Sequence, residues 1–206
     1  MLLSPSLRGV RFSRTELRHL AVGTTLVTAA GVSFIITDPS YKNYAPGLIL
    51  AALIFSMGFI LHELAHKYVA QGYGLWAEFR VNATGVLLTA LSIVSPIKFI
   101  APGAVMISGF AEKDHIGRTA IAGPIVNVII AMALLTLLPV LQQSIVYLPI
   151  LFGASINAFL ALFNLIPFSV FDGRKVYSWN KRYWAALFVL SLALTIYTNF
   201  VLRPFS

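Results

Sequence analysis

The chain has 206 residues, of which 58% are hydrophobic and only 11% are charged, and its mean hydropathy is +0.84. In soluble domains about a quarter of the residues are charged. This composition therefore excludes an ordinary soluble protein and indicates an integral membrane protein. The net charge of +8 fits basic loops at the cytoplasmic face of a membrane, and we expect no nucleic-acid partner. Cysteine is absent, which excludes disulfides and thiolate metal ligands.

The N-terminal part predicts a basic tail followed by a first membrane span. A chain of this length forms one compact domain, here residues 1–206. Residues 1–18 are polar and basic, which favours a cytoplasmic N-terminal segment. Leu20 to Thr37 is uncharged and long enough for a span. A signal peptide is the alternative, although this apolar stretch is longer than a usual signal core.

The second span begins near Pro46 and carries the motif His62-Glu63-x-x-His66. Two histidines four residues apart lie on one helical face, so both imidazoles can reach one ion. Zn²⁺ accepts nitrogen and carboxylate ligands, and Glu63 is placed to act as the general base. A chance motif on a soluble helix would be a solvated patch. Residues 47–61 carry no charge, and ionisable groups in such a helix are costly and usually functional.

The segment after the motif is the hardest to interpret. Residues 75–81 alternate as a strand does. Gly85 to Gly109 is apolar, but prolines and Lys98 interrupt it. A single crossing here would move the later basic loops to the other side of the membrane. We therefore predict a β-hairpin, a re-entrant loop or a pair of short helices, lying beside the metal-bearing helix and lining the substrate path. A passive membrane-surface anchor is the alternative.

Three further spans are predicted at residues 117–140, 146–166 and 183–202. Small residues in the first of them permit close helix packing, and Asn127 can form a hydrogen bond across helices. The resulting fold is an all-α polytopic membrane protein with about five to six transmembrane helices and one small β or re-entrant element. The distribution of Lys and Arg places the N-terminus and the active-site end in the cytoplasm.

Asp172 is the predicted third metal ligand. Helices entering from the same side bring His62 and Asn164 to similar depth, and Pro167 then breaks the second helix. The chain can continue unwound and turn Asp172 back towards the histidines. Two histidines, one carboxylate and a water form a recognised catalytic zinc set, here one ion per chain. The alternative is an Asp-Gly turn that ends the helix at the interface.

Three motifs occur in order across residues 46–175, the predicted catalytic core: His62-Glu63-x-x-His66, Gly123-Pro124-x-x-Asn127 and Asn164-x-x-Pro167-x-x-x-x-Asp172-Gly173. In this order and setting the chain resembles the site-2 protease family of intramembrane zinc metalloproteases (peptidase family M50), in particular its short archaeal members. The resemblance implies that His62, His66 and Asp172 bind zinc and that Glu63 activates water. It also implies a catalytic role for Asn164, in positioning the substrate or stabilising the oxyanion.

The expected function is hydrolysis of peptide bonds in or near transmembrane segments of membrane-anchored proteins, as in regulated intramembrane proteolysis. The expected partners are a transmembrane protein substrate and the lipid bilayer. A second copy of the chain and a regulatory membrane protein are further candidate partners. One alternative is a membrane metal-binding or transport protein, or a catalytically silent scaffold of the same fold. A zinc protease of the prenyl-protein-processing type would need a downstream glutamate ligand, and none is suitably placed.

Overall fold

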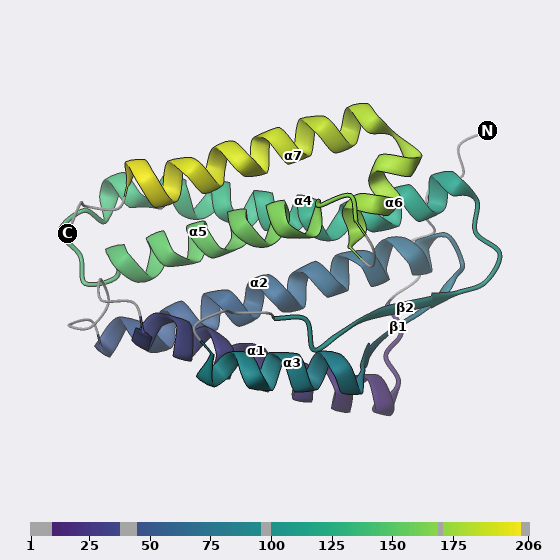
Figure 1. Cartoon of the computed structure of the whole chain (residues 1–206), viewed down its shortest axis with the longest axis horizontal. Coiled ribbons are helices and arrows are strands. Elements are labelled where there is room, and N and C mark those ends of the chain that lie inside the picture. Colours follow the sequence, from purple (N-terminus) through teal and green to yellow (C-terminus); the bar gives the residue numbers. More distant parts are fainter. Residues whose placement is uncertain (1–9, 38–44, 96–99, 169–170, 203–206) are drawn as a thin grey trace.

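Helices dominate the computed structural model of the protein, which describes residues 10–37, 45–95, 100–168 and 171–202 (Figure 1). Four helical segments in these ranges are long and apolar enough to cross a membrane: Gly47–Gly72, Lys113–Val140, Tyr147–Asn164 and Lys181–Phe200. They confirm the predicted all-α fold of a polytopic membrane protein. Helix α1 (Arg14–Thr37) covers the expected first span, and α3 (Ala83–Val94) is a shorter apolar helix.

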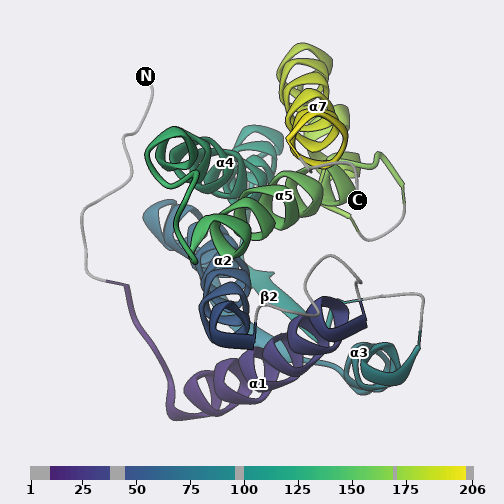
Figure 2. The same ribbon diagram turned by 90° about the vertical axis from the view of Figure 1, so that its left-hand side faces the viewer.

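Helix α2 (Ala45–Gly72) lies at the centre of the molecule. Figure 2 shows α1 and α3 on one side of α2 and the helices α4 (Lys113–Leu137), α5 (Tyr147–Asn164) and α7 (Lys181–Ile196) on the other. A cluster of buried side chains joins α1, α2 and α5 around Phe55 and Phe152. The two histidines therefore sit on the helix that most of the other helices surround.

The segment between α2 and α4 folds as a strand, a helix and a second strand. After a turn at Gly74, whose φ is +76°, β1 (Trp76–Val81) leads into α3. The strand β2 (Gly103–Ser108) then returns and pairs antiparallel with β1, from Trp76 opposite Ser108 to Val81 opposite Gly103. The chain thus comes back to the end from which it left, as all three predicted arrangements (a β-hairpin, a re-entrant loop or a pair of short helices) require. The interrupting residues Pro96 and Lys98 lie outside the described ranges.

Helices of the C-terminal half pack against α2 and against one another. Asn127 of α4 donates hydrogen bonds to the carbonyl of Gly58 in α2 (3.2 Å) and to Oδ1 of Asn157 in α5 (2.8 Å), which confirms the predicted bond across helices. After α5, the short helix α6 (Asp172–Trp179) precedes α7. A Cβ on Gly173 would lie 2.1 Å from the carbonyl oxygen of Leu165. Glycine is needed there because it lets the start of α6 pack against the end of α5.

Candidate metal centre

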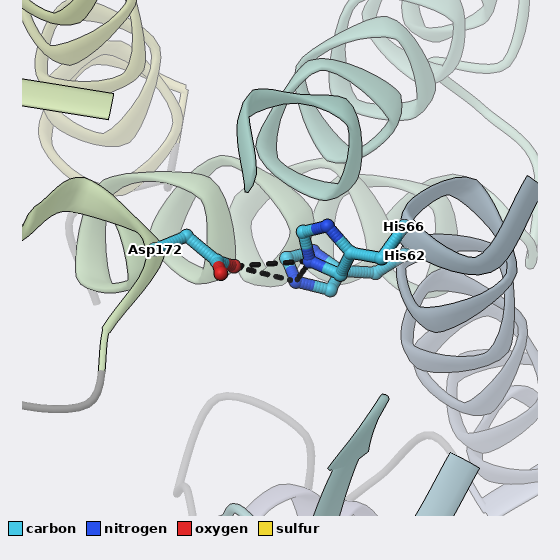
Figure 3. Close-up of side chains that lie close together, drawn as sticks. All are labelled: His62, His66 and Asp172. Carbon is cyan, nitrogen blue, oxygen red and sulfur yellow. Dashed lines mark hydrogen bonds and ion pairs between the residues drawn. The ribbon is translucent and has the colours of Figure 1, made fainter. Parts of the chain in front are cut away.

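His62, His66 and Asp172 bring their ligand atoms together between α2 and α6 (Figure 3). The Nε2 atoms of the two histidines are 3.0 Å apart. Oδ2 of Asp172 lies 3.0 Å from Nε2 of His66 and 3.5 Å from Nε2 of His62. Both histidines are 6% exposed. The three residues that the sequence predicts as a ligand set therefore form one compact group.

The spacing of these three atoms fits a tetrahedral zinc ion. Ligand bonds of about 2.0–2.1 Å at tetrahedral angles separate neighbouring ligand atoms by about 3.3 Å. The observed separations run from 3.0 to 3.5 Å. A group of two imidazoles and one carboxylate also matches the ligand types of catalytic zinc sites, which keep a fourth position for water. The residues present thus fit this ion in both distance and chemistry.

Hydrogen bonds behind the imidazoles fix which nitrogen faces the group. Nδ1 of His66 donates to the backbone carbonyl of Thr119 (2.7 Å), and a carbonyl oxygen can only accept. Nδ1 of His62 lies 2.5 Å from Oδ1 of Asn127, whose Nδ2 is occupied by Gly58 and Asn157. Both Nδ1 atoms therefore carry the proton of the neutral ring, and both Nε2 lone pairs face inward. Converging lone pairs beside a carboxylate are stable when a cation lies among them.

Gly123 provides the space at the centre of the group. A Cβ on this residue would lie 2.4 Å from Nε2 of His66 and 2.6 Å from Nε2 of His62. Any side chain here would occupy the region into which the two lone pairs point. Helix α4 therefore approaches the imidazoles closely while it leaves room for an ion.

Asp172 has the charge that a cation site requires. Burial alone would raise its pKa, but positive charge within the group, carried by protonated imidazoles of His66 and His62 or by a bound cation, holds the pKa of this carboxyl well below its usual range. Nζ of Lys175, on the outer side of α6, lies 3.5 Å from the other carboxylate oxygen, Oδ1. An ionised carboxylate thus completes the group with its Oδ2 atom.

Glu63 connects the motif helix to the sheet. It follows His62 on α2, is 8% exposed, and its Oε2 accepts a hydrogen bond from the backbone N–H of Val105 in β2 (3.1 Å). The predicted general base therefore lies against the strand that returns from the re-entrant segment. Sequence patterns did not indicate this contact, because it depends on the pairing of β2 with β1.

The predicted catalytic role of Asn164 stays a prediction. Asn164 is the last residue of α5, and its Nδ2 donates to the carbonyl of Leu160 (2.9 Å). Within the described ranges no hydrogen bond or ion pair joins it to His62, His66 or Asp172. The buried asparagines that do reach the group are Asn127, directly, and Asn157, through Asn127. Their signal in the sequence is an uncharged polar residue in the middle of an apolar span.

Two curated proteins of Methanocaldococcus jannaschii are similar to this chain. One, provisionally named a zinc metalloprotease, is 35% identical over 193 residues, which are 92% of this chain and 97% of the relative. The second, named a zinc metalloprotease, is 32% identical over 159 residues, which are 77% of this chain but 40% of that longer protein. No family model matches the sequence. No solved structure matches it either.

Proposed function

The chain belongs to the zinc metalloprotease family of these archaeal relatives, and from that premise we propose that it is an intramembrane zinc endopeptidase of the site-2 protease type. Its substrates are membrane-anchored proteins, cut in or near their transmembrane segments. One observation carries the proposal: His62 and His66 lie on a helix long and apolar enough to cross a membrane, and Asp172 closes the ligand group. A soluble protease has no reason to bury its metal site along such a helix.

The residues have separate roles in this proposal. His62, His66 and Asp172 would hold one zinc ion, which when bound polarises a carbonyl and lowers the pKa of water. Glu63 accepts a proton from the attacking water as the water oxygen bonds to the carbonyl carbon. The same carboxyl then donates that proton to the amide nitrogen as the C–N bond breaks. Asn164 is the proposed positioning group for the substrate carbonyl, and this role requires its amide to leave Leu160.

The outer edge of β2 is the proposed substrate-binding element. A transmembrane helix hides its peptide bonds and must unwind before it can be cut. The N–H of Phe79, opposite Val105, bonds to a side chain of α1 and not to β2. This pair is therefore of the non-hydrogen-bonded type, and the backbone groups of Val105 point away from β1. An extended segment could pair along this edge once the N–H of Val105, which donates to Glu63, turns to the segment, and the segment would then lie beside that carboxylate.

We also propose that the site end of the molecule faces the cytoplasm. The sheet, α6 and the start of α1 lie at the same end of the molecule (Figure 1). This end carries described basic residues on α1, α6 and α7: Arg14, Arg18, Arg174, Lys175 and Lys181. Basic residues gather on the cytoplasmic side of membrane proteins. The scissile bond would then lie near the cytoplasmic face.

The proposal is tested with the purified full chain in proteoliposomes that also contain single-span substrate proteins. We expect about one zinc per wild-type chain, and cleavage that a chelator stops and added zinc restores. Glu63→Gln should keep the zinc and lose cleavage, because the amide cannot accept the proton of the water. Zinc bound without cleavage of any substrate would favour the silent scaffold. A wild-type chain that holds no zinc would contradict both readings.

A further inference from the structure

A fully buried ion pair joins the metal-bearing helix α2 to α1. Lys67, the residue after His66 in α2, donates a hydrogen bond to Oε2 of Glu16 in α1, and both residues are 0% exposed. Two charges removed from solvent are costly, and their mutual attraction often does no more than offset that cost. Net stabilisation is therefore a weak reason for such a pair to exist. Because Lys67 follows a candidate metal ligand on the same helix, the pair connects that helix to its surroundings at the level of the site.

Glu16 joins three elements through its two carboxylate oxygens. Oε2 binds Lys67 on α2, and Oε1 accepts a hydrogen bond from the backbone N–H of Phe79 in β1 (3.0 Å). The N–H of Glu16 itself donates to Oγ of Ser13 (3.1 Å) at the start of α1. One buried carboxylate thus connects α1, the motif helix and the sheet.

The same side of β1 is closed along its length. Besides the Phe79 contact, the N–H of Val81 donates to Nδ1 of His19 (3.3 Å), and the carbonyl of Ala77 accepts from Nε2 of Gln71 (3.1 Å). No further strand can pair on this edge while these side chains occupy it. These contacts hold the sheet through β1. The opposite edge of the sheet, on β2, is the one that contacts Glu63.

We propose that Glu16 and Lys67 are positioning residues, which fix the sheet to the metal-bearing helix and so set the place of the β2 edge relative to Glu63. This inference rests on the proposed function, because that edge is where the substrate segment would lie. A two-stranded sheet is only marginally stable alone and must be anchored by its surroundings. Lys67 follows a proposed zinc ligand, so the anchor and the ligand belong to one helical turn.

Two double variants separate the role of the anchor from the cost of buried charge. E16Q/K67Q removes both charges, but the new amide at position 16 can still accept from Phe79 and can bond to the new amide at position 67. E16M/K67M also removes both charges and leaves Phe79 without its acceptor. The matched control is Arg118→Gln, which breaks the ion pair between Arg118 and Asp114 (2.6 Å). The side chains of Arg118 and Asp114 are 45% and 43% exposed, so this control removes an ion pair that is not buried.

The first readout is hydrogen exchange of the backbone amides of Phe79 and Val105, measured on the full chain in detergent. We expect E16M/K67M to speed exchange at both amides, and E16Q/K67Q and Arg118→Gln to leave both close to wild type. Faster exchange at Val105, which Glu16 does not touch, would show that the anchor on β1 controls the edge on β2. Unchanged exchange at both amides in E16M/K67M would overturn the inference.

The second readout is cleavage of a single-span substrate. A misplacement of about 1 Å can cost about a hundredfold in rate, so we expect E16M/K67M to lose about tenfold to a hundredfold in kcat/KM. Most of that loss should appear as a raised KM, with zinc content unchanged. E16Q/K67Q should stay within about threefold, because the amide oxygen introduced at position 16 can still accept from the N–H of Phe79. A loss in kcat alone, or an equal loss in both double variants, would contradict a role in positioning the edge.

A replacement variant and the exchange measurement allow the anchor to be tested even if E16M/K67M does not fold or the wild-type chain is inactive. If E16M/K67M does not fold, the charge-swapped E16K/K67E replaces it, since an ammonium group at position 16 balances the charge but cannot accept from Phe79. If the wild-type chain cleaves none of the substrates, the proposed function fails, and the exchange comparison still decides whether Glu16 and Lys67 anchor the sheet.

Discussion

Gly123→Ala is the substitution that probes the metal centre most sharply. The added methyl carbon would lie 2.4 Å from Nε2 of His66 and 2.6 Å from Nε2 of His62. Ordinary contacts of a Cβ begin near 3.4 Å, so the imidazoles or α4 must move by about 1 Å. Zinc ligand distances tolerate only about 0.2 Å, and a displacement of about 1 Å near the chemistry costs about a hundredfold in rate.

We therefore expect Gly123→Ala to lose most of its zinc and at least about a hundredfold in kcat/KM. Zinc is measured by elemental analysis of the purified chain, and cleavage with a single-span substrate in proteoliposomes. Gly153→Ala is the matched control, because its Cβ would lie 2.5 Å from Cγ2 of Ile54, in helix packing away from the ligand group. That variant should lose about 1–3 kcal/mol of stability and keep its zinc. Full zinc and wild-type cleavage in Gly123→Ala would show that the space beside Gly123 is not where the ion binds.

Substitutions elsewhere in the chain test three other features of the molecule. Asn127→Ala removes the acceptor for Nδ1 of His62 and should weaken zinc affinity by about 10–100-fold in a chelator competition; unchanged affinity would argue against this contact. Charged substitutions at Val86 or Ile107 should reduce cleavage and leave zinc bound, whereas normal cleavage would leave the re-entrant segment as a passive anchor. Single cysteines near Gln142 should react with an impermeant reagent from outside intact cells, and those near Lys181 should not; the reverse pattern would invert the proposed orientation.

The local features of the site were predictable from the sequence. The motif His62-Glu63-x-x-His66 has the helical spacing that a single ion requires, and the long apolar run identifies its helix as a span. Asp172 was predicted as the third ligand from a helix that ends before Pro167, and the structure brings its carboxylate to the histidines. In each case a short stretch of chain carries both the chemistry and the local geometry.

The non-local features were not predictable. Residues 85–109 are mostly apolar and show no alternation that distinguishes α3 from β2. The register of β2 also depends on a partner strand more than 20 residues earlier in the chain. The contact between Glu63 and Val105 follows from that register. The space beside Gly123 likewise depends on how closely α4 approaches α2. Packing of distant segments decides all of these, and single-sequence patterns do not encode it.

The position at which a substrate is cut is the most direct evidence for or against intramembrane proteolysis by this chain. Mass spectrometry of the products formed in proteoliposomes from a single-span substrate gives the new termini for wild type and Glu63→Gln. We predict one cleavage site in or near the transmembrane segment, towards its cytoplasmic end, for wild type, and no products for Glu63→Gln. Cleavage confined to the soluble parts of the substrate, or the same products from both proteins, would contradict an intramembrane zinc endopeptidase that uses Glu63 as its base.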